Sequence, residues 1–269
     1  MVTVNTGGSR RFEGKIAVVT GAAQGLGRAT ALRLGAEGAT VVIGDRVREQ
    51  ADKVKDELHA LGAESRVVMA DMETWKGAEK LMAEAHYAYG RIDVCINNVG
   101  GTIWAMPYYE YEPEHIEKEI SRTLWPTLWG CRAVVPYMVK QKSGAIVNIG
   151  SVATRTINRV PYSAAKGGVH AITVCLAFEL VEHGIRVNCI SPGGIDVGVR
   201  ATPRGPAPQG EQELAWRKQM IARDMQDTPM KRMGQPEELA AAVAFVASDE
   251  ASYMTGEIVD VSGGCTGRI

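Results

Sequence analysis

Short β-branched runs alternate with longer amphipathic stretches along almost the whole chain. The longer stretches place apolar residues three and four positions apart, which is typical of helices packed on one face. The short runs are continuously apolar, which indicates strands that are covered on both faces. The predicted strands span 15–20, 40–45, 65–71, 91–98, 144–151, 185–191 and 257–261. The predicted helices begin near Leu26 and then span 47–61, 74–89, 113–142, 161–183 and 236–248.

This order of elements predicts an α/β fold of the Rossmann type. We expect a doubly wound, seven-stranded parallel sheet with helices on both faces. No Pro- or Ser-rich linker and no repeat divides the chain, so we expect a single catalytic domain over 12–269 after a flexible N-terminal arm over 1–11. The segment 195–230 is rich in Gly, Pro, Arg and Gln and interrupts the alternation. We interpret it as an insertion that covers the substrate as a lid.

Composition narrows the function classes. Lys and Arg number 30 against 31 Asp and Glu, so the near-neutral charge favours neither a nucleic-acid partner nor an anionic membrane surface. No apolar run approaches the roughly 18 residues that span a bilayer. The first dozen residues lack the apolar centre of a secretory signal. The five cysteines form no CxxC pair and the five histidines lack ligand spacing, so we expect no metal site and a cytoplasmic protein with reduced thiols.

A glycine-rich string predicts a dinucleotide cofactor. Residues 20–27, Thr-Gly-Ala-Ala-Gln-Gly-Leu-Gly, join the first predicted strand to the first helix. Glycines at such a junction let a pyrophosphate approach the N–H groups of a helix N-terminus, although a plain tight turn would use them too. Asp45 ends the second strand, where a carboxylate binds an adenosine ribose and repels a 2′-phosphate. Arg46 follows and could hold that phosphate, but the carboxylate beside it favours NAD; the alternative for Asp45 is a helix N-cap.

Tyr162 and Lys166 are the candidate catalytic pair. They stand four residues apart and so share one face of a predicted helix. A neighbouring ammonium stabilises phenolate and moves a tyrosine pKa of about 10 towards neutrality, which suits a general base that removes an alcohol proton. Such a pair is frequent by chance on solvated helix faces. Ser151, which ends the preceding strand, strengthens the catalytic interpretation because its hydroxyl can bond the same substrate oxygen.

The glycine-rich string, Asn97-Asn98-Val99-Gly100, Ser151 and the Tyr-x-x-x-Lys pair together resemble the short-chain dehydrogenase/reductase family. The resemblance covers residues 12–264, including Pro192-Gly193 and the Arg-Met-Gly-Gln-Pro-Glu-Glu run at 232–238. It implies hydride transfer to NAD, with Ser151, Tyr162 and Lys166 as catalytic residues, and assembly into homotetramers or homodimers. The implied cofactor-binding residues are Gly21, Gln24, Gly25, Leu26, Gly27, Asp45, Arg46, Asp71, Met72, Asn98, Val99, Gly100, Tyr162, Lys166, Pro192, Gly193 and Ile195.

The chain departs from the family pattern at three places. Thr123 stands where the family has a catalytic asparagine, and Val197 stands where a threonine usually follows Pro-Gly. The usual Asp-Gly-Gly near the end reads Ser-Gly-Gly at 262–264. None of these changes touches Tyr162 or Lys166. We therefore expect the activity class to hold and the proton relay to be arranged differently.

A narrower resemblance indicates the substrate class. Segments 98–104, 124–129 and 153–162 resemble those of the dihydrodiol carboxylate dehydrogenases of aromatic-acid degradation, first the benzoate type and then the p-cumate type. This implies NAD-dependent oxidation of a small carboxylated cis-dihydrodiol; a benzoate-type product would lose carbon dioxide and aromatise to catechol. The alternatives are a p-cumate or toluate dihydrodiol dehydrogenase, a 3-oxoacyl or other short-chain reductase, and a non-catalytic NAD-binding regulator.

A carboxylated ring diol requires an apolar wall and a cation. Trp104, after the cofactor-side loop, is the candidate wall. Arg155 and Arg159 precede the candidate catalytic tyrosine, and Arg200 and Arg204 lie on the predicted lid. A guanidinium suits a carboxylate because two parallel hydrogen bonds join them. The alternative for each arginine is a surface or subunit-contact charge.

Overall fold

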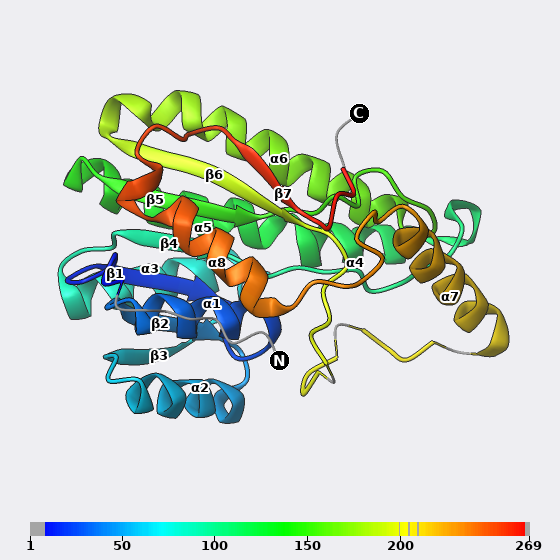
Figure 1. The fold of residues 1–269 in the computed structure, drawn as a ribbon, viewed down its shortest axis with the longest axis horizontal. Helices are drawn as coiled ribbons and strands as arrows, with labels where there is room; N and C mark the ends of the chain where they lie inside the picture. The colour runs from blue at the N-terminus through cyan, green and yellow to red at the C-terminus, as the bar shows by residue number, and fades with distance from the viewer. Residues whose placement is uncertain (1–8, 199, 204, 209, 267–269) are drawn as a thin grey trace.

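The structure is a computed structural model that describes residues 9–198, 200–203, 205–208 and 210–266. Its described residues form one parallel sheet of seven strands in the order β3-β2-β1-β4-β5-β6-β7, between helical layers (Figure 1). The strands are β1 (Ile16–Thr20), β2 (Thr40–Asp45), β3 (Ser65–Met69), β4 (Val94–Asn97), β5 (Gly144–Ile149), β6 (Ile185–Pro192) and β7 (Ile258–Val261). The longer helices are α1 (Gly25–Ala36), α2 (Arg48–Ala60), α3 (Trp75–Tyr89), α4 (Pro113–Thr123), α5 (Trp125–Gln141), α6 (Val160–Leu180), α7 (Gly210–Gln226) and α8 (Pro236–Ala247). Short 3₁₀ turns are η1 (Tyr108–Glu110), η2 (Val181–His183) and η3 (Asp249–Ala251).

Two apolar cores lie on opposite faces of this sheet. Helices α1, α2 and α8 cover one face, with Leu34, Leu58 and Val243 in its core. Helices α3, α5 and α6 cover the other, with Leu81 and Met138 in its core. The predicted fold class is confirmed. The order of the strands reverses between β1 and β4, and a crevice forms at such a reversal beyond the carboxyl ends of the strands.

The single long helix predicted over 113–142 is wrong. The structure has two helices there, α4 and α5, which meet at Leu124. Pro126 explains the break: it lacks the N–H that would bond to the carbonyl of Arg122, and its ring crowds the preceding turn. Thr123 is therefore held at the junction, fully buried, where its Oγ1 accepts a hydrogen bond from the Gly101 N–H at 3.4 Å.

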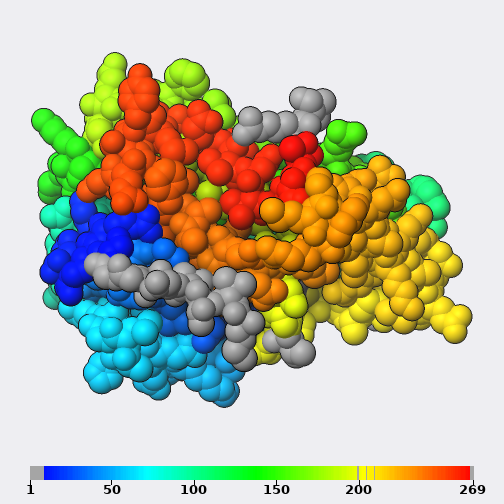
Figure 2. All heavy atoms as spheres, in the orientation of Figure 1, coloured from blue at the N-terminus to red at the C-terminus, as the bar shows by residue number. Residues whose placement is uncertain are grey.

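The predicted lid region contains a helix that the sequence pattern did not reveal. Helix α7 fills much of its second half and lies at one end of the molecule, away from the sheet (Figure 1). In the space-filling view this region forms a lobe beside the body of the molecule (Figure 2). Met220 is the buried residue of α7 within the described part of the chain, so the helix has no broad apolar face. Without that face, periodicity carries little signal.

The end of the predicted N-terminal arm is anchored. Arg11 donates from Nε to Oε2 of Glu37 at 2.6 Å and from Nη1 to Oε2 of Glu250 at 3.0 Å. The Glu37 side chain is fully buried, and Arg33 binds it as well. Residues 1–8 of that predicted arm lie outside the described residues.

The expectation that no stretch of the chain is long and apolar enough to span a membrane is wrong, because helix α6 meets both criteria. Together with η2 it covers Val160–His183, with a mean hydropathy of 1.4 in its most apolar window. Glycines, alanines and one serine interrupt its large apolar residues, so the helix has no continuous run of large apolar residues although its average hydropathy is high. In this fold the helix packs against β6 and α4, and Tyr162 and Lys166 in its first turns are buried.

Candidate active site

A cavity of about 300 Å³ lies at the carboxyl ends of the central strands. It collects most of the residues predicted from sequence. Those lining it are Gly21, Gln24, Leu26, Asp45, Arg46, Asp71, Met72, Asn98, Val99, Gly100, Ser151, Arg155, Arg159, Tyr162, Lys166, Pro192, Gly193, Ile195 and Arg200. Gly25 and Gly27 belong to the turn and helix start beside it. The cavity is also lined by residues that the sequence analysis did not identify, because no recognisable motif marks them. They are Glu73, Thr102, Arg122, Asp224, Asp227, Thr228 and Cys265.

The glycine-rich turn has the geometry of a phosphate cradle. Gly21 and Gly25 have φ values of +62° and +56°, which favour glycine. A Cβ on Gly27 would lie 2.1 Å from the carbonyl oxygen of Gly21, so the helix can approach the turn only with glycine there. Asn98 fixes the turn from β4, because its Nδ2 donates to the carbonyls of Thr20 and Gly21 at 2.9 and 3.1 Å. Backbone and helix N-terminus thus fit a pyrophosphate.

The Asp45 carboxylate is tied to the same turn. Its Oδ2 accepts a hydrogen bond from the Ala23 N–H at 3.0 Å, and its Oδ1 accepts from the N–H groups of Arg46 and Val47 at 2.7 and 3.1 Å. Val47, rather than Asp45, occupies the N-cap position of α2. The carboxylate is held at the cavity and keeps lone pairs that could accept hydrogen bonds from ribose hydroxyls.

Glu73 binds three cations at this end of the cavity. It accepts hydrogen bonds from Arg122 Nη1 at 2.5 Å, Lys118 Nζ at 3.2 Å and Arg46 Nη1 at 3.4 Å. Burial opposes ionisation of Glu73, but the hydrogen bonds from Arg122 and Lys118 outweigh it and hold its pKa below the ordinary value. Arg46 is therefore already engaged with a carboxylate, and Asp71 adds another acidic group nearby.

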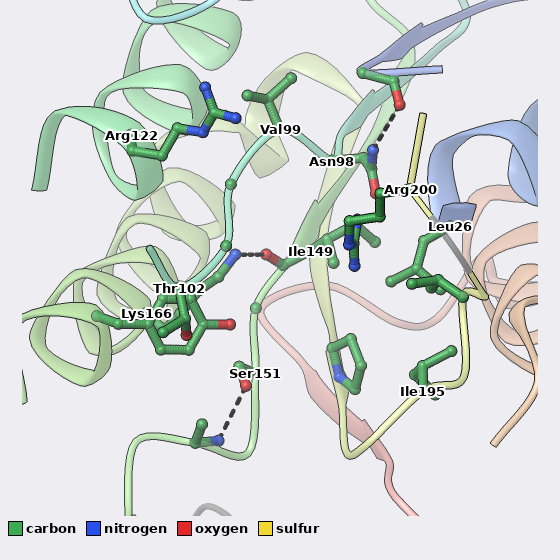
Figure 3. A pocket seen from close by; sticks show the side chains of 18 of the residues that line it. Leu26, Asn98, Val99, Thr102, Arg122, Ile149, Ser151, Lys166, Ile195 and Arg200 are labelled. Atoms are coloured by element: carbon green, nitrogen blue, oxygen red, sulfur yellow. Dashed lines mark hydrogen bonds between the residues drawn. The ribbon is translucent and has the colours of Figure 1, made fainter. Parts of the chain in front are cut away.

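Ser151, Tyr162 and Lys166 all line this cavity. Figure 3 shows Ser151 and Lys166 on the opposite side of it from Leu26 and Ile195. All three are more than nine-tenths buried. Lys166 Nζ donates to the Ile149 carbonyl at 2.5 Å, and Ser151 Oγ accepts from the Ala153 N–H at 3.0 Å. Ser151 follows β5, whereas the other two stand one turn apart near the start of α6. These side chains supply a hydroxyl, a phenol and an ammonium to the cavity.

The junction of α4 and α5 adds a backbone carbonyl to this end. A Cβ on Gly100 would lie 3.4 Å from Lys166 Nζ and 3.6 Å from the Thr123 carbonyl oxygen, so the absent side chain keeps this space open. The Thr127 N–H bonds to the Leu124 carbonyl at 3.1 Å. Thr123 thus places a backbone oxygen beside Gly100, although it lacks the amide of the family asparagine.

The candidate substrate residues have different surroundings. Arg159 is paired with Asp224, 2.6 Å from Nη2 to Oδ2, and its guanidinium lies 5.8 Å from the centre of the Tyr162 ring. Arg155 is an exposed residue of the cavity lining and forms no ion pair with the described residues. Arg200 lies over the glycine-rich turn near Leu26 (Figure 3), where its Nη1 would be 3.9 Å from a Cβ on Gly25. Arg204 lies outside the described residues.

Trp104 does not line the cavity among the described residues, contrary to its expected role as an apolar wall. Its ring packs on His115, with centroids 4.4 Å apart. The N–H groups of Ile103 and Trp104 both bond to Oε1 of the buried Glu119, which turns this loop towards α4. Val152 and Ile195 supply apolar lining instead.

Comparison with known proteins identifies the class to which this site belongs. The family model of the short chain dehydrogenases matches residues 15–205, and the chain belongs to this family. The chain is 47% identical to the 1,6-dihydroxycyclohexa-2,4-diene-1-carboxylate dehydrogenase of Acinetobacter baylyi, covering 96% of this chain and 99% of that protein. It is 48% identical to the Pseudomonas putida protein of the same name, covering 96% and 95%. Among solved structures it resembles levodione reductase, with a TM-score of 0.83, 33% identity and coverage of 94% and 98%.

Family and cavity together define the chemistry. The chain is a nicotinamide-dependent oxidoreductase, and the family resemblance that the sequence motifs indicated is confirmed. The glycine-rich turn, Asp45 and the space kept open by Gly100 fit the pyrophosphate, ribose and nicotinamide parts of such a cofactor.

Proposed function

We propose that this protein catalyses the NAD-dependent oxidation of 1,6-dihydroxycyclohexa-2,4-diene-1-carboxylate, the benzoate-type cis-diol. The observation that carries the proposal is 47–48% identity over 96% of the chain to two dehydrogenases of that name, combined with a complete Ser151, Tyr162 and Lys166 site. Arginines around the cavity suit the carboxylate of this substrate.

The reaction assigns a separate task to each catalytic residue. Tyr162, as phenolate, takes the proton of the secondary alcohol, and Ser151 Oγ donates a hydrogen bond to the oxygen that becomes a carbonyl. Lys166 favours the phenolate through its charge. A bound nicotinamide supplies the acceptor for the hydride that leaves the alcohol carbon. The ketone then stands β to the carboxylate, so the bond to carbon dioxide can break, its electron pair passing into the ring and a proton returning to oxygen to give catechol.

The choice of NAD rests on the acidic end of the cavity. A 2′-phosphate placed there would meet the Asp45 carboxylate, with Glu73 and Asp71 close by. Arg46 and Arg122, which would otherwise attract the phosphate, are already bound to Glu73. A ribose with free hydroxyls is neutral and can donate hydrogen bonds to Asp45, which favours NAD over NADP.

Arg155 is the residue that we assign to the substrate carboxylate. Its charge has no ion-pair partner within the described chain, whereas Arg159 is paired with Asp224. Arg200 lies over the glycine-rich turn and so suits a cofactor phosphate better than the ring. Ser151 and Arg155 both lie in the segment that follows β5, and both line the cavity, so both can reach the same substrate.

The remaining proposals concern the whole molecule. We propose one catalytic domain over 12–269, with 195–230 as a substrate lid, acting in the cytoplasm. We also propose assembly into homotetramers or homodimers, as the family resemblance implies. Exposed apolar side chains on α5 and α6, among them Trp125 and Phe178, support such assembly.

A substrate panel tests the function. NADH formation is measured with carboxylated and uncarboxylated cis-dihydrodiols, including the benzoate, toluate and p-cumate types. We expect the benzoate type to give the highest kcat/KM, with catechol and carbon dioxide as products. Tyr162→Phe should abolish turnover and retain cofactor binding. Preference for NADPH with a 3-oxoacyl thioester would support the reductase alternative instead, and turnover by Tyr162→Phe would refute the catalytic assignment.

A further inference from the structure

Arg159 has a contact that the proposed reaction does not use. Its guanidinium carbon lies 5.8 Å from the centre of the Tyr162 ring, within the range at which a cation interacts with an aromatic face. The side chain is only 13% exposed, so solvent screens this interaction weakly. Arg159 directly precedes α6, and Tyr162 lies in the first turn of that helix.

Asp224 of α7 fixes the guanidinium in this place. Arg159 Nη2 donates to both carboxylate oxygens of Asp224, at 2.8 and 2.6 Å. Thr156 Oγ1 completes the arrangement, since it bonds to Arg159 Nη2 at 3.3 Å and to Asp224 Oδ1 at 3.2 Å. The pair joins two segments 65 residues apart and thereby ties the predicted lid to the catalytic tyrosine.

We propose that Arg159, held by Asp224, is a positioning residue that favours the phenolate form of Tyr162 through its charge over the ring. The inference rests on the proposed role of Tyr162 as the base. Deprotonation turns a weak attraction between a cation and an aromatic face into attraction between opposite charges. Arg159 thus adds to the effect of Lys166, and it does so when α7 is in place.

Other titratable groups line the same cavity or lie beyond Arg159, and they oppose or support this effect. In the cavity they are Lys166 on α6, Arg155 after β5, Asp224 on α7, Asp227 directly after α7 and the Cys265 thiol; beyond Arg159 they are Tyr111 and Glu119. Burial raises the pKa of Cys265, as do the carboxylates of Asp227 and Asp224, so the thiol stays neutral. Asp224 contributes in two opposite ways: it holds the cation, and its own charge disfavours phenolate. This opposition provides a test.

The test is the pH profile of kcat/KM for the full-length protein with NAD and the benzoate-type diol carboxylate. The rate rises as Tyr162 loses its proton. In Arg159→Gln the rising limb should move to higher pH by about one unit, with activity largely recovered on the alkaline plateau. Arg159→Lys keeps the charge and should stay near the wild-type profile. Asp224→Asn keeps an acceptor for the guanidinium but loses its charge, so the limb should move to lower pH.

A merely structural role predicts another pattern. If Arg159 only braces α7, Arg159→Gln and Asp224→Asn should both lower the plateau and leave the limb in place, or move it in the same direction; either result overturns the proposal. Arg217→Met, which changes an exposed arginine of α7, is the matched control, and melting temperature and NADH binding verify folding. Absence of oxidation by the wild type would instead count against the proposed substrate. In that case the same profiles are measured with any cis-dihydrodiol that the panel shows to be oxidised.

Discussion

The side-chain amide of Gln24 forms two hydrogen bonds with the backbone of Thr202. Its Nε2 donates to the Thr202 carbonyl at 3.0 Å, and its Oε1 accepts from the Thr202 N–H at 3.1 Å. Gln24 belongs to the glycine-rich turn, and Thr202 belongs to the segment between β6 and α7, 178 residues away. The phosphate cradle and the predicted lid are therefore joined by one side chain.

Gln24→Leu tests this connection. The substitution removes both hydrogen bonds, each worth about 1 kcal/mol, and frees the segment that carries Thr202. We expect the KM for NAD to rise about tenfold, measured by initial rates, while the melting temperature changes little. Gln212→Leu, at an exposed glutamine of α7, is the control. An unchanged KM in Gln24→Leu would show that the connection does not contribute to cofactor binding.

Asp45→Ser tests cofactor selectivity. The serine keeps a small polar group but removes the charge that repels a 2′-phosphate and accepts the ribose hydroxyls. We expect kcat/KM with NAD to fall at least tenfold and the ratio of NADP to NAD activity to increase. Asp56→Ser changes an exposed aspartate of α2 and should alter neither value. A wild type that prefers NADP, or an unaltered ratio in Asp45→Ser, contradicts the proposal.

Arg155→Met tests recognition of the carboxylate. A paired guanidinium and carboxylate contribute about 1.5–3 kcal/mol, so kcat/KM for a carboxylated diol should fall between 10- and 100-fold. Rates on an uncarboxylated cis-dihydrodiol should stay within about threefold of wild type. Initial rates on matched substrates measure both, with Arg217→Met as the control. An equal loss on the two substrates would assign Arg155 a structural role.

Glu37 makes stability depend on acidity. Burial opposes its ionisation, but hydrogen bonds from Arg11 and Arg33 outweigh this and lower its folded-state pKa. Its contribution is therefore present above the unfolded-state pKa of about 4.3 and is lost as the pH falls through the folded-state value.

Glu37→Gln should lower the free energy of unfolding at pH 7 by roughly 3 kcal/mol, because it leaves two partly buried arginines without their carboxylate. It should also flatten the decline in stability below pH 5. Urea unfolding at several pH values measures both effects. Glu79→Gln, at an exposed glutamate of α3, should leave the curve unaltered. A parallel decline in Glu37→Gln and wild type would assign the acid sensitivity to other carboxylates.

Features encoded in short stretches could be predicted from the sequence. Each strand is a local apolar run, so the seven strands and their parallel orientation could be predicted, with strand ends displaced by a few residues. The spacing of Tyr162 and Lys166 defines a helix face wherever the helix lies. Gly21 and Gly27 could be identified because they stand in one glycine-rich stretch of eight residues, 20–27. Asp45 could be identified because it ends a predicted strand.

Contacts between distant segments could not be predicted in this way. Pro126 marks a possible break, but that the break places the Thr123 carbonyl beside Gly100 depends on how α4, α5 and α6 pack. Trp104 has a large apolar side chain that suits a cavity wall, yet Glu119 binds the loop backbone and turns the loop towards His115.

The sequence by itself determined the fold class, the glycine-rich turn proposed as the cofactor cradle and the proposed catalytic pair, because each depends on residues that are neighbours along one element. Only the tertiary structure decided the different surroundings of the arginines. Arg155 and Arg159 lie on one short loop and look equivalent in sequence. In the structure Asp224 pairs with Arg159, and Asp224 belongs to α7, a helix that could not be predicted because it has no broad apolar face. Charge compensation depends on distance in space, and periodicity along the chain carries no information about that distance.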